Sequence, residues 1–239
     1  MSLFAIGDPH LSFGCQKPMD IFKGWENHAQ RLAENWKNAV GENDTVVLPG
    51  DISWAMNFEE LLPDFQFLHR LPGKKVILKG NHDYWWNGIG QVRRALPASM
   101  HAVQHDAVDL GGAVVTGTRG WVYPTERAPL LPENARIFNR EMIRLELGLQ
   151  SAAQMAQGRP IVVMLHYPPL DQQERDTPFT RLLEQYPVHT VVYGHLHGAG
   201  IRTGFTGEQR GIRYLLTSCD SLNFSLAELS VPLGNITEE

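Results

Sequence analysis

Five short segments of this chain carry carboxylate, imidazole and amide side chains, the ligand types that suit manganese, iron, zinc and cobalt. The segments are Asp8-Pro9-His10, Gly50-Asp51, Gly80-Asn81-His82-Asp83, His166 and Gly194-His195-Leu196-His197. Their six or seven potential ligands are too many for one tetrahedral zinc ion. They suit two divalent metal ions that share a bridging carboxylate and lie about 3.5–4 Å apart.

The spacing within two of the segments supports this interpretation. Asp8 and His10 are two positions apart, as are His195 and His197. In an extended chain, residues i and i+2 point to the same side, so each pair is expected to reach one metal cluster. Three glycines beside the ligands are expected to provide tight turns and close backbone approach. They are Gly50, Gly80 and Gly194.

Each segment alone has an ordinary structural explanation. Gly50-Asp51 is a common turn sequence, and a lone His166 after an apolar run is typical of a buried, hydrogen-bonded core histidine. The metal-site hypothesis therefore rests on all five segments together, each directly after an apolar run.

Those apolar runs are predicted β-strands that alternate with helical patterns, which is typical of α/β proteins. In open α/β sheets the carboxyl ends of the strands form the ligand-binding crevice, so the five segments are expected to converge on one rim. The predicted strands are Leu3–Gly7, Thr45–Leu48, Lys75–Lys79, Ala113–Thr116, Ile161–Leu165, Thr190–Tyr193 and Tyr214–Thr217.

Apolar residues at helical spacing predict helices over Trp25–Ala39 and Ile137–Leu149. A third helix is expected near Leu61–Leu71, with its start left open by Pro63.

The helix-free stretch Asp106–Gly120 is expected to mark the point where one β/α half gives way to another. Thr203–Gly211 predicts a hairpin turn, and the tail after Pro232 a loose terminus.

The composition is that of a globular protein, with 239 residues, 43% hydrophobic and 20% charged. The formal net charge of -5 disfavours a nucleic-acid partner. It is compatible with an anionic substrate, because bound divalent cations can reverse the local electrostatic field. Two cysteines rule out a disulfide scaffold. No signal segment and no membrane-spanning run is recognised, so we expect a cytoplasmic protein without a membrane partner.

The five segments, in this order, resemble the signature of the calcineurin-like metallophosphoesterases, which runs Asp-x-His, Gly-Asp, Gly-Asn-His-Asp/Glu, His and Gly-His-x-His. The resemblance extends from Asp8 to His197, and the Trp-rich surroundings of Asp51 and His82 look like a bacterial branch. It implies an α/β fold, a four-layer α/β/β/α sandwich with two mixed β-sheets and a metal site at the strand C-terminal ends. We expect residues 1–239 to form one such domain.

The resemblance also implies a role for each residue. Two divalent metal ions (Mn, Fe, Zn or Co) would be held, the first by Asp8, His10 and His197, the second by Asn81, His166 and His195, with Asp51 bridging. His82 would act as general acid or phosphate contact, and Asp83 would orient the His82 ring. The implied reaction is in-line attack by a metal-bridging hydroxide on a small phosphodiester or phosphomonoester.

Alternative functions stay open at this point. Ser/Thr protein phosphatases of this superfamily continue Gly-Asp with Asp-Arg-Gly, and Ile52-Ser53-Trp54 stands there in this chain. The alternatives are a metal-dependent nuclease, a non-catalytic protein-interaction module on the same fold, and a metal-binding or redox protein, which the ligand types favour least. The sequence assigns no oligomeric state.

Further residues near the motifs have two interpretations each. Arg119 would clamp a phosphate or lie on the surface, and Tyr84, Trp85 and Trp86 would form a stacking wall or pack in the core. Substrate specificity is expected in four loops: Phe13–Gly24, Trp54–Phe58, Tyr84–Val92 and Trp121–Glu133.

Overall fold

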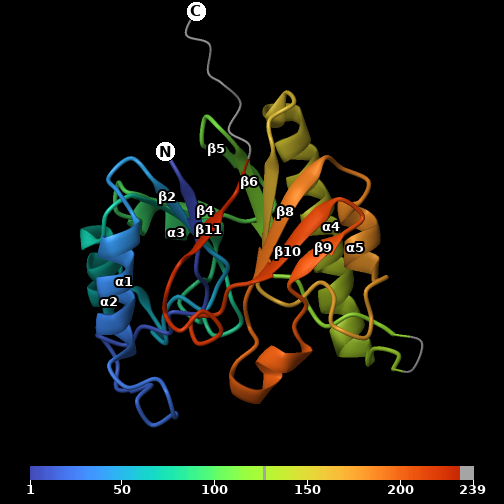
Figure 1. Ribbon diagram of the computed structural model, residues 1–239. Helices are drawn as coiled ribbons and strands as arrows, with labels where there is room; N and C mark the ends of the chain where they lie inside the picture. Colours follow the sequence, from blue (N-terminus) through green and yellow to red (C-terminus); the bar gives the residue numbers. More distant parts are fainter. Residues whose placement is uncertain (126–127, 232–239) are drawn as a thin grey trace, which may run out of the picture.

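Two β-sheets pack face to face between two layers of helices in the computed structural model, which describes residues 1–125 and 128–231 (Figure 1). The first sheet has the strand order β11-β1-β2-β3-β4, parallel except for β11. Its strands are β1 (Leu3–Ala5), β2 (Thr45–Leu48), β3 (Lys74–Leu78), β4 (Met100–Val103) and β11 (Ala227–Leu229).

The second sheet has the order β5-β6-β7-β8-β10-β9, with a parallel centre and an antiparallel strand at each edge. Its strands are β5 (Ala107–Asp109), β6 (Val114–Thr118), β7 (Ile161–Leu165), β8 (Val188–Tyr193), β9 (Gly207–Gln209) and β10 (Ile212–Leu216). Both sheets are therefore mixed, as the expected fold class requires.

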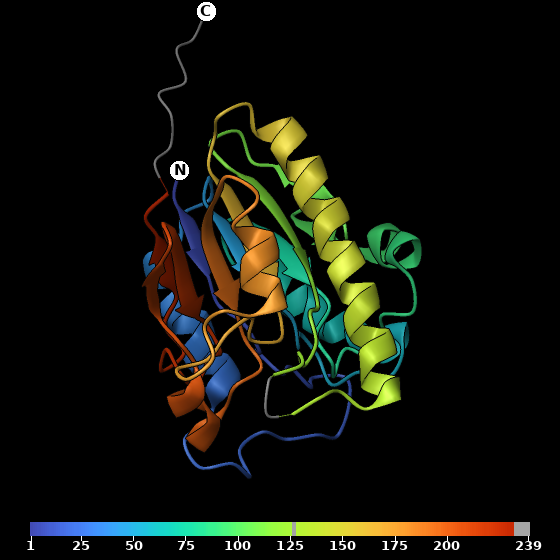
Figure 2. The same ribbon diagram turned by 90° about the vertical axis from the view of Figure 1, so that its right-hand side faces the viewer.

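Helices cover the outer face of each sheet. The first sheet carries α1 (His28–Ala39) and α2 (Phe58–Arg70), with α3 (Ile89–Ala95) beside β4. The second sheet carries the long α4 (Pro132–Ala156) and α5 (Pro178–Leu183), as Figure 2 shows from the side. A short 3₁₀ helix, η1 (Gly198–Thr203), follows β8 at the lower edge of the molecule.

Alternation along the strands explains the layers, because successive side chains point to opposite faces of a sheet. In β2, Val47 belongs to the core between the two sheets, whereas Val46 and Leu48 belong to the core under α1 and α2. In β7, Val162 faces the inter-sheet core, and Val163 faces the core under α4 and α5. The central strands of each sheet are buried on both faces, so they are continuous apolar runs.

The predicted strands are confirmed to within two residues at each end, and all three predicted helices are present. The helix near Leu61–Leu71 begins earlier, at Phe58, because the Asn57 side chain accepts a hydrogen bond from the Glu60 backbone N–H. Pro63 lies inside that helix, where burial of Leu61, Phe65 and Leu68 offsets its missing N–H donor.

The expectation for Asp106–Gly120 is confirmed, since β5 and β6 begin the second sheet there. Thr203–Gly211 contains β9 and the turn that leads to β10, which confirms the hairpin. The tail after Pro232 lies outside the described residues. Cys15 and Cys219 are both free thiols.

None of the helices in the described ranges combines the length and the apolar character that crossing a membrane requires.

Candidate metal centre

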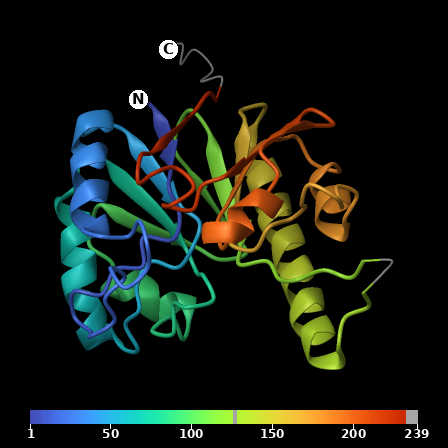
Figure 3. The ribbon, with the colours of Figure 1, turned by 60° about the horizontal axis from the view of Figure 1, so that its bottom comes forward.

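The loops after β1, β2, β3, β7 and β8 meet at one edge of the two sheets, which Figure 3 turns toward the viewer. Backbone hydrogen bonds join these loops. The Asp8 N–H donates to the Gly50 carbonyl at 3.0 Å, and the Gly194 N–H donates to the His166 carbonyl at 3.2 Å. Between the sheets, the Gly7 N–H donates to Thr217 at 2.7 Å. All five sequence segments therefore share one rim.

One group of potential ligands consists of Asp8, His10 and His197. The Nε2 atoms of His10 and His197 are 3.4 Å apart, and His197 Nε2 lies 3.6 Å from Asp8 Oδ1. Both Asp8 and His10 are buried. These atoms converge on a common point and can reach one cation.

A second group lies beside the first and contains Asp8, Asp51 and His166. The Asn81 Oδ1 atom is 2.6 Å from His166 Nε2 and 2.9 Å from His195 Nδ1, which adds an amide oxygen and another imidazole. The Nδ1 atom of His166 lies 3.0 Å from the Pro49 carbonyl. A hydrogen bond there orients the ring and leaves Nε2 available as a ligand.

Asp51 stands between the two groups. Its Oδ2 atom is 3.7 Å from His10 Nε2 on one side and 3.5 Å from His166 Nε2 on the other. Its Oδ1 atom accepts a hydrogen bond from the His82 backbone N–H at 2.7 Å. One carboxylate oxygen is thus anchored, and the other faces both groups.

The residues fit a cation chemically. Separations of 3.5–3.7 Å between carboxylate oxygens and imidazole nitrogens exceed hydrogen-bond lengths. Burial raises the pKa of Asp51, and the neighbouring Asp8 carboxylate raises it further. Burial also opposes ionisation of Asp8, but the neighbouring imidazoles of His197 and His166 lower its pKa overall. Two adjacent buried carboxylates of this kind are stabilised together by positive charge.

The three glycines singled out in the sequence are confirmed as points of close approach. A Cβ atom on Gly80 would lie 2.1 Å from Asp51 Oδ1, and one on Gly194 would lie 2.1 Å from Asp8 Oδ2. At Gly50, a Cβ atom would lie 2.6 Å from His166 Nδ1, and the backbone has φ +101°. The ligand side chains occupy the space that any larger residue would fill.

Four of the potential ligands have left-handed backbone conformations: Asp8, His10, Asp51 and His195, with φ between 44° and 73°. The pairs Asp8/His10 and His195/His197 do meet at the site, but the extended-chain explanation for their meeting is wrong. Such conformations cost about 1–3 kcal/mol each and persist where the surrounding structure imposes them. Here hydrogen bonds between loops hold them: the Asp8 N–H donates to the Gly50 carbonyl, the His10 N–H to the Asp51 carbonyl, and the His195 N–H to the Asp8 carboxylate.

His82 lies beside the metal-ligand groups, half-buried. Its ring is 4.4 Å from Trp54 and 5.8 Å from His10 between centroids, and its Nδ1 atom is 3.4 Å from the Tyr84 hydroxyl. Burial lowers the pKa of His82, and the nearby His166 lowers it further. The ring lines a pocket of 400 Å³ together with His10 and His197.

Asp83 does not orient the His82 ring, so that expectation is wrong. Its carboxylate accepts hydrogen bonds from the backbone N–H groups of Ile52, Ser53 and Gly80 at 2.7–3.1 Å, and from the Trp85 indole at 3.1 Å. These donors occupy the fully buried carboxylate, and burial raises its pKa to about 7. Asp83 ties the loop after β2 to the loop after β3.

The stacking-wall interpretation is wrong for Trp85 and Trp86, which are buried in the core under α1 and α2. Only Tyr84 is exposed, and it lies beside His82. Two of the expected specificity loops do border the His82 pocket, through Met19, Phe22 and Trp54.

Sequence reasoning missed Asp220. Its Oδ1 atom accepts a hydrogen bond from His197 Nδ1 at 2.8 Å, and its Oδ2 atom accepts one from the Gly198 N–H at 2.9 Å. Burial alone would lower the pKa of His197, but the hydrogen bond to Asp220 and the nearby Asp8 carboxylate raise it to about 10. The sequence did contain a signal for Asp220. Like the residues of the five segments, it is a polar residue that follows a predicted strand, here Tyr214–Thr217.

We expect Asp220→Asn to weaken metal binding by roughly 10–100-fold, because carboxylates behind histidine ligands contribute about that much to affinity. Calorimetric titration with Mn²⁺ measures the change. Glu208→Gln, the same type of substitution at an exposed position of β9, is the control. Equal Mn²⁺ affinity in the Asp220 variant and the control would rule out this role for Asp220.

Comparison with known proteins agrees with the sequence resemblance. The model of the family described as "Calcineurin-like phosphoesterase" matches residues 1–199 of this chain. No curated protein matches the chain in sequence.

Among solved structures, a phosphopantetheinyl hydrolase from Mycobacterium tuberculosis is similar, with TM-score 0.57 and 16% identity over 96% of this chain and 95% of that one. A protein of unknown function from Aquifex aeolicus has TM-score 0.51 and 15% identity over 95% of both chains. At these identities the likeness shows a shared fold.

Proposed function

Since this chain belongs to the calcineurin-like phosphoesterase family, we propose that it hydrolyses a small phosphodiester or phosphomonoester with the help of two divalent metal ions. The observation that carries the proposal is the position of Asp51, whose free carboxylate oxygen lies within 3.7 Å of a histidine from each group of potential ligands. A carboxylate in that position suits a ligand shared by two cations.

In this proposal the ligands divide as the family signature implies. Asp51 is shared, and the buried, oxygen- and nitrogen-rich set suits Mn, Fe, Zn or Co. When bound, the two cations supply an activated water and offset the negative charge of the phosphate in the transition state. The first set is Asp8, His10 and His197, and the second is Asn81, His166 and His195.

His82 is proposed to act on the leaving group. Its ring faces the same pocket as His10 and His197, so a phosphoester held at the metal centre would direct its leaving oxygen toward an imidazole N–H. Trp25 and Trp54 line that pocket as well, which supports a small leaving group with an apolar part.

A panel of model substrates tests the proposal. We expect the protein to hydrolyse bis-p-nitrophenyl phosphate, p-nitrophenyl phosphate or both when supplied with Mn²⁺, Co²⁺, Ni²⁺ or Zn²⁺, with Mg²⁺ less effective because the site is rich in imidazole. Removal of metal with a chelator should abolish turnover, and re-addition should restore it. Turnover that persists at full rate in the metal-free protein would contradict the proposal.

A further inference from the structure

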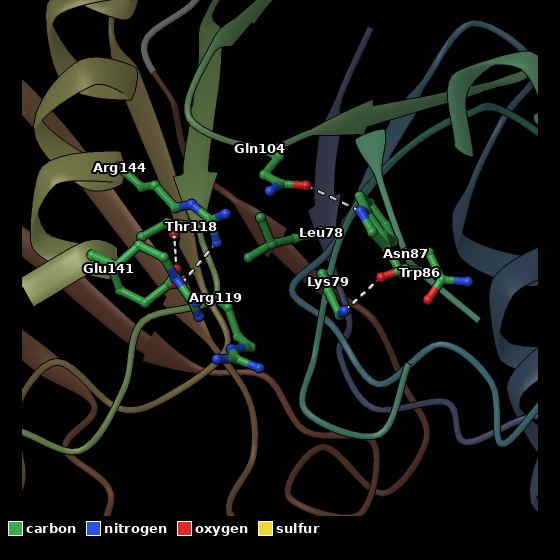
Figure 4. Close-up of a pocket in the computed structure, with 10 residues that line it drawn as sticks. Leu78, Lys79, Trp86, Asn87, Gln104, Thr118, Arg119, Glu141 and Arg144 are labelled. Atoms are coloured by element: carbon green, nitrogen blue, oxygen red, sulfur yellow. Dashed lines mark hydrogen bonds and ion pairs between the residues drawn. The ribbon is translucent and has the colours of Figure 1, made fainter. Parts of the chain in front are cut away.

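A second pocket, of 220 Å³, opens between the ends of β3 and β6 and the side of α4 (Figure 4). Lys79 and Trp86 line it from the segment after β3, Arg119 from the segment after β6, and Arg144 from α4. None of the metal-ligand residues lines it, so it is distinct from the pocket beside His82.

The pocket is strongly cationic in a chain whose formal net charge is -5. Four cationic residues line it against a single acid, Glu141. They are Lys79, Arg119, Arg140 and Arg144. Taking four positive charges and one negative leaves a formal charge of +3, which favours a multiply charged anion.

Glu141 organises one side of the pocket. It is fully buried, accepts a hydrogen bond from the Thr118 hydroxyl, and pairs with Arg144 at 2.9 Å and with Arg140 at 3.2 Å. These bonds hold the two guanidinium groups of α4 at the pocket and leave most of their N–H donors available.

Lys79 and Arg119 form no ion pair with an acidic side chain among the described residues. The Lys79 ammonium donates to the Trp86 carbonyl at 2.6 Å, and the Arg119 guanidinium lies 4.6 Å from the Trp121 ring centroid. The Nε atom of Arg119 is buried, and no described group accepts its hydrogen bond. A buried donor of this kind is normally matched by an acceptor.

The pocket adjoins the metal centre through the backbone. Lys79 directly precedes Gly80-Asn81, and the Arg119 carbonyl accepts hydrogen bonds from the backbone N–H groups of His166 at 3.0 Å and Tyr167 at 2.9 Å. The segments that carry Lys79 and Arg119 are therefore joined directly to the segments that carry Asn81 and His166.

We propose that this pocket binds a second phosphate group of the substrate, so that the physiological substrate carries two phosphate groups, one at the metal centre and one here. The inference rests on the proposed hydrolase function. A phosphate dianion matches the +3 lining better than a carboxylate does, and arginine forks bind its oxygens in pairs.

Binding of non-hydrolysable probes tests the inference. Methylenediphosphonate carries two phosphonate groups and methylphosphonate carries one. We expect the Mn²⁺-supplied full-length protein to bind methylenediphosphonate at least about tenfold more tightly, as measured by calorimetry. Arg119→Gln should reduce that preference severalfold or more, whereas Arg136→Gln, an exposed arginine of α4 outside the pocket, should keep it.

The possible outcomes distinguish the second-phosphate site from the proposed hydrolase function. An equal preference in wild type and Arg119→Gln would overturn the second-phosphate site, even if aryl phosphates are hydrolysed. An Arg119-dependent preference without hydrolysis of any phosphoester would support the anion pocket and reject the proposed function instead. Chelation of Mn²⁺ by the diphosphonate contributes to the preference in every variant. It therefore cancels when Arg119→Gln is compared with wild type and with Arg136→Gln.

Discussion

Asp51→Asn is expected to lose turnover and bound metal together, with the rate falling by more than about 100-fold. A residue behind a metal ligand already contributes about 10–100-fold, and Asp51 is proposed to contact both ions directly. The substitution keeps the shape of the side chain. Its amide oxygen can still accept the hydrogen bond from the His82 backbone N–H, so the loop is expected to stay in place.

Two measurements on purified protein check this result. The metal content, measured by elemental analysis, should fall together with the turnover rate. The rise in melting temperature on addition of Mn²⁺ should be much smaller than in wild type, because ligand binding stabilises the folded state. Glu34→Gln makes the same chemical change on the exposed face of α1 and should alter neither quantity. A variant with full metal content and normal turnover would remove Asp51 from the proposed centre.

His82→Ala is expected to lose turnover by about 10²–10⁴-fold while retaining both metal ions, since general acid catalysis contributes about that much. The structure explains the separation of the two effects. Only the backbone N–H of His82 bonds Asp51, and alanine keeps that N–H. The lost ring is half-buried against Trp54, so the free energy of unfolding should change little.

Steady-state kinetics with p-nitrophenyl phosphate and with a phosphoester of a poorer leaving group give the sharpest comparison. The defect should be larger for the poorer leaving group, because that group depends more on protonation. His101→Ala, at an exposed position of β4, serves as control. A defect of equal size on both substrates would assign His82 to phosphate binding instead of proton donation.

Much of the fold could be predicted because strands buried on both faces leave continuous apolar runs. The runs at Thr45–Leu48 and Ile161–Leu165 are examples whose bounds match the structure. The missed strands lack that signal. β9 and β11 are three-residue edge strands that each carry a glutamate, and β4 has the sequence Met-His-Ala-Val, with one β-branched residue.

The candidate site could be predicted as a set of residues, because each follows a predicted strand and strand ends share a rim. The local arrangement could not. Left-handed conformations at Asp8 and Asp51 depend on hydrogen bonds between loops far apart in the sequence. The partners of Asp83 and Asp220 depend on the same tertiary packing, so the sequence misassigned the first and passed over the second.

The bonds that Asp83 makes to the neighbouring loops, and the bond between His166 and Pro49, join protein atoms to protein atoms only. These bonds would therefore hold the loops of the proposed metal centre in the same positions whichever cation it binds. We therefore expect the element found in the purified protein to reflect what the cell or the growth medium supplies, as much as any selectivity of the ligands.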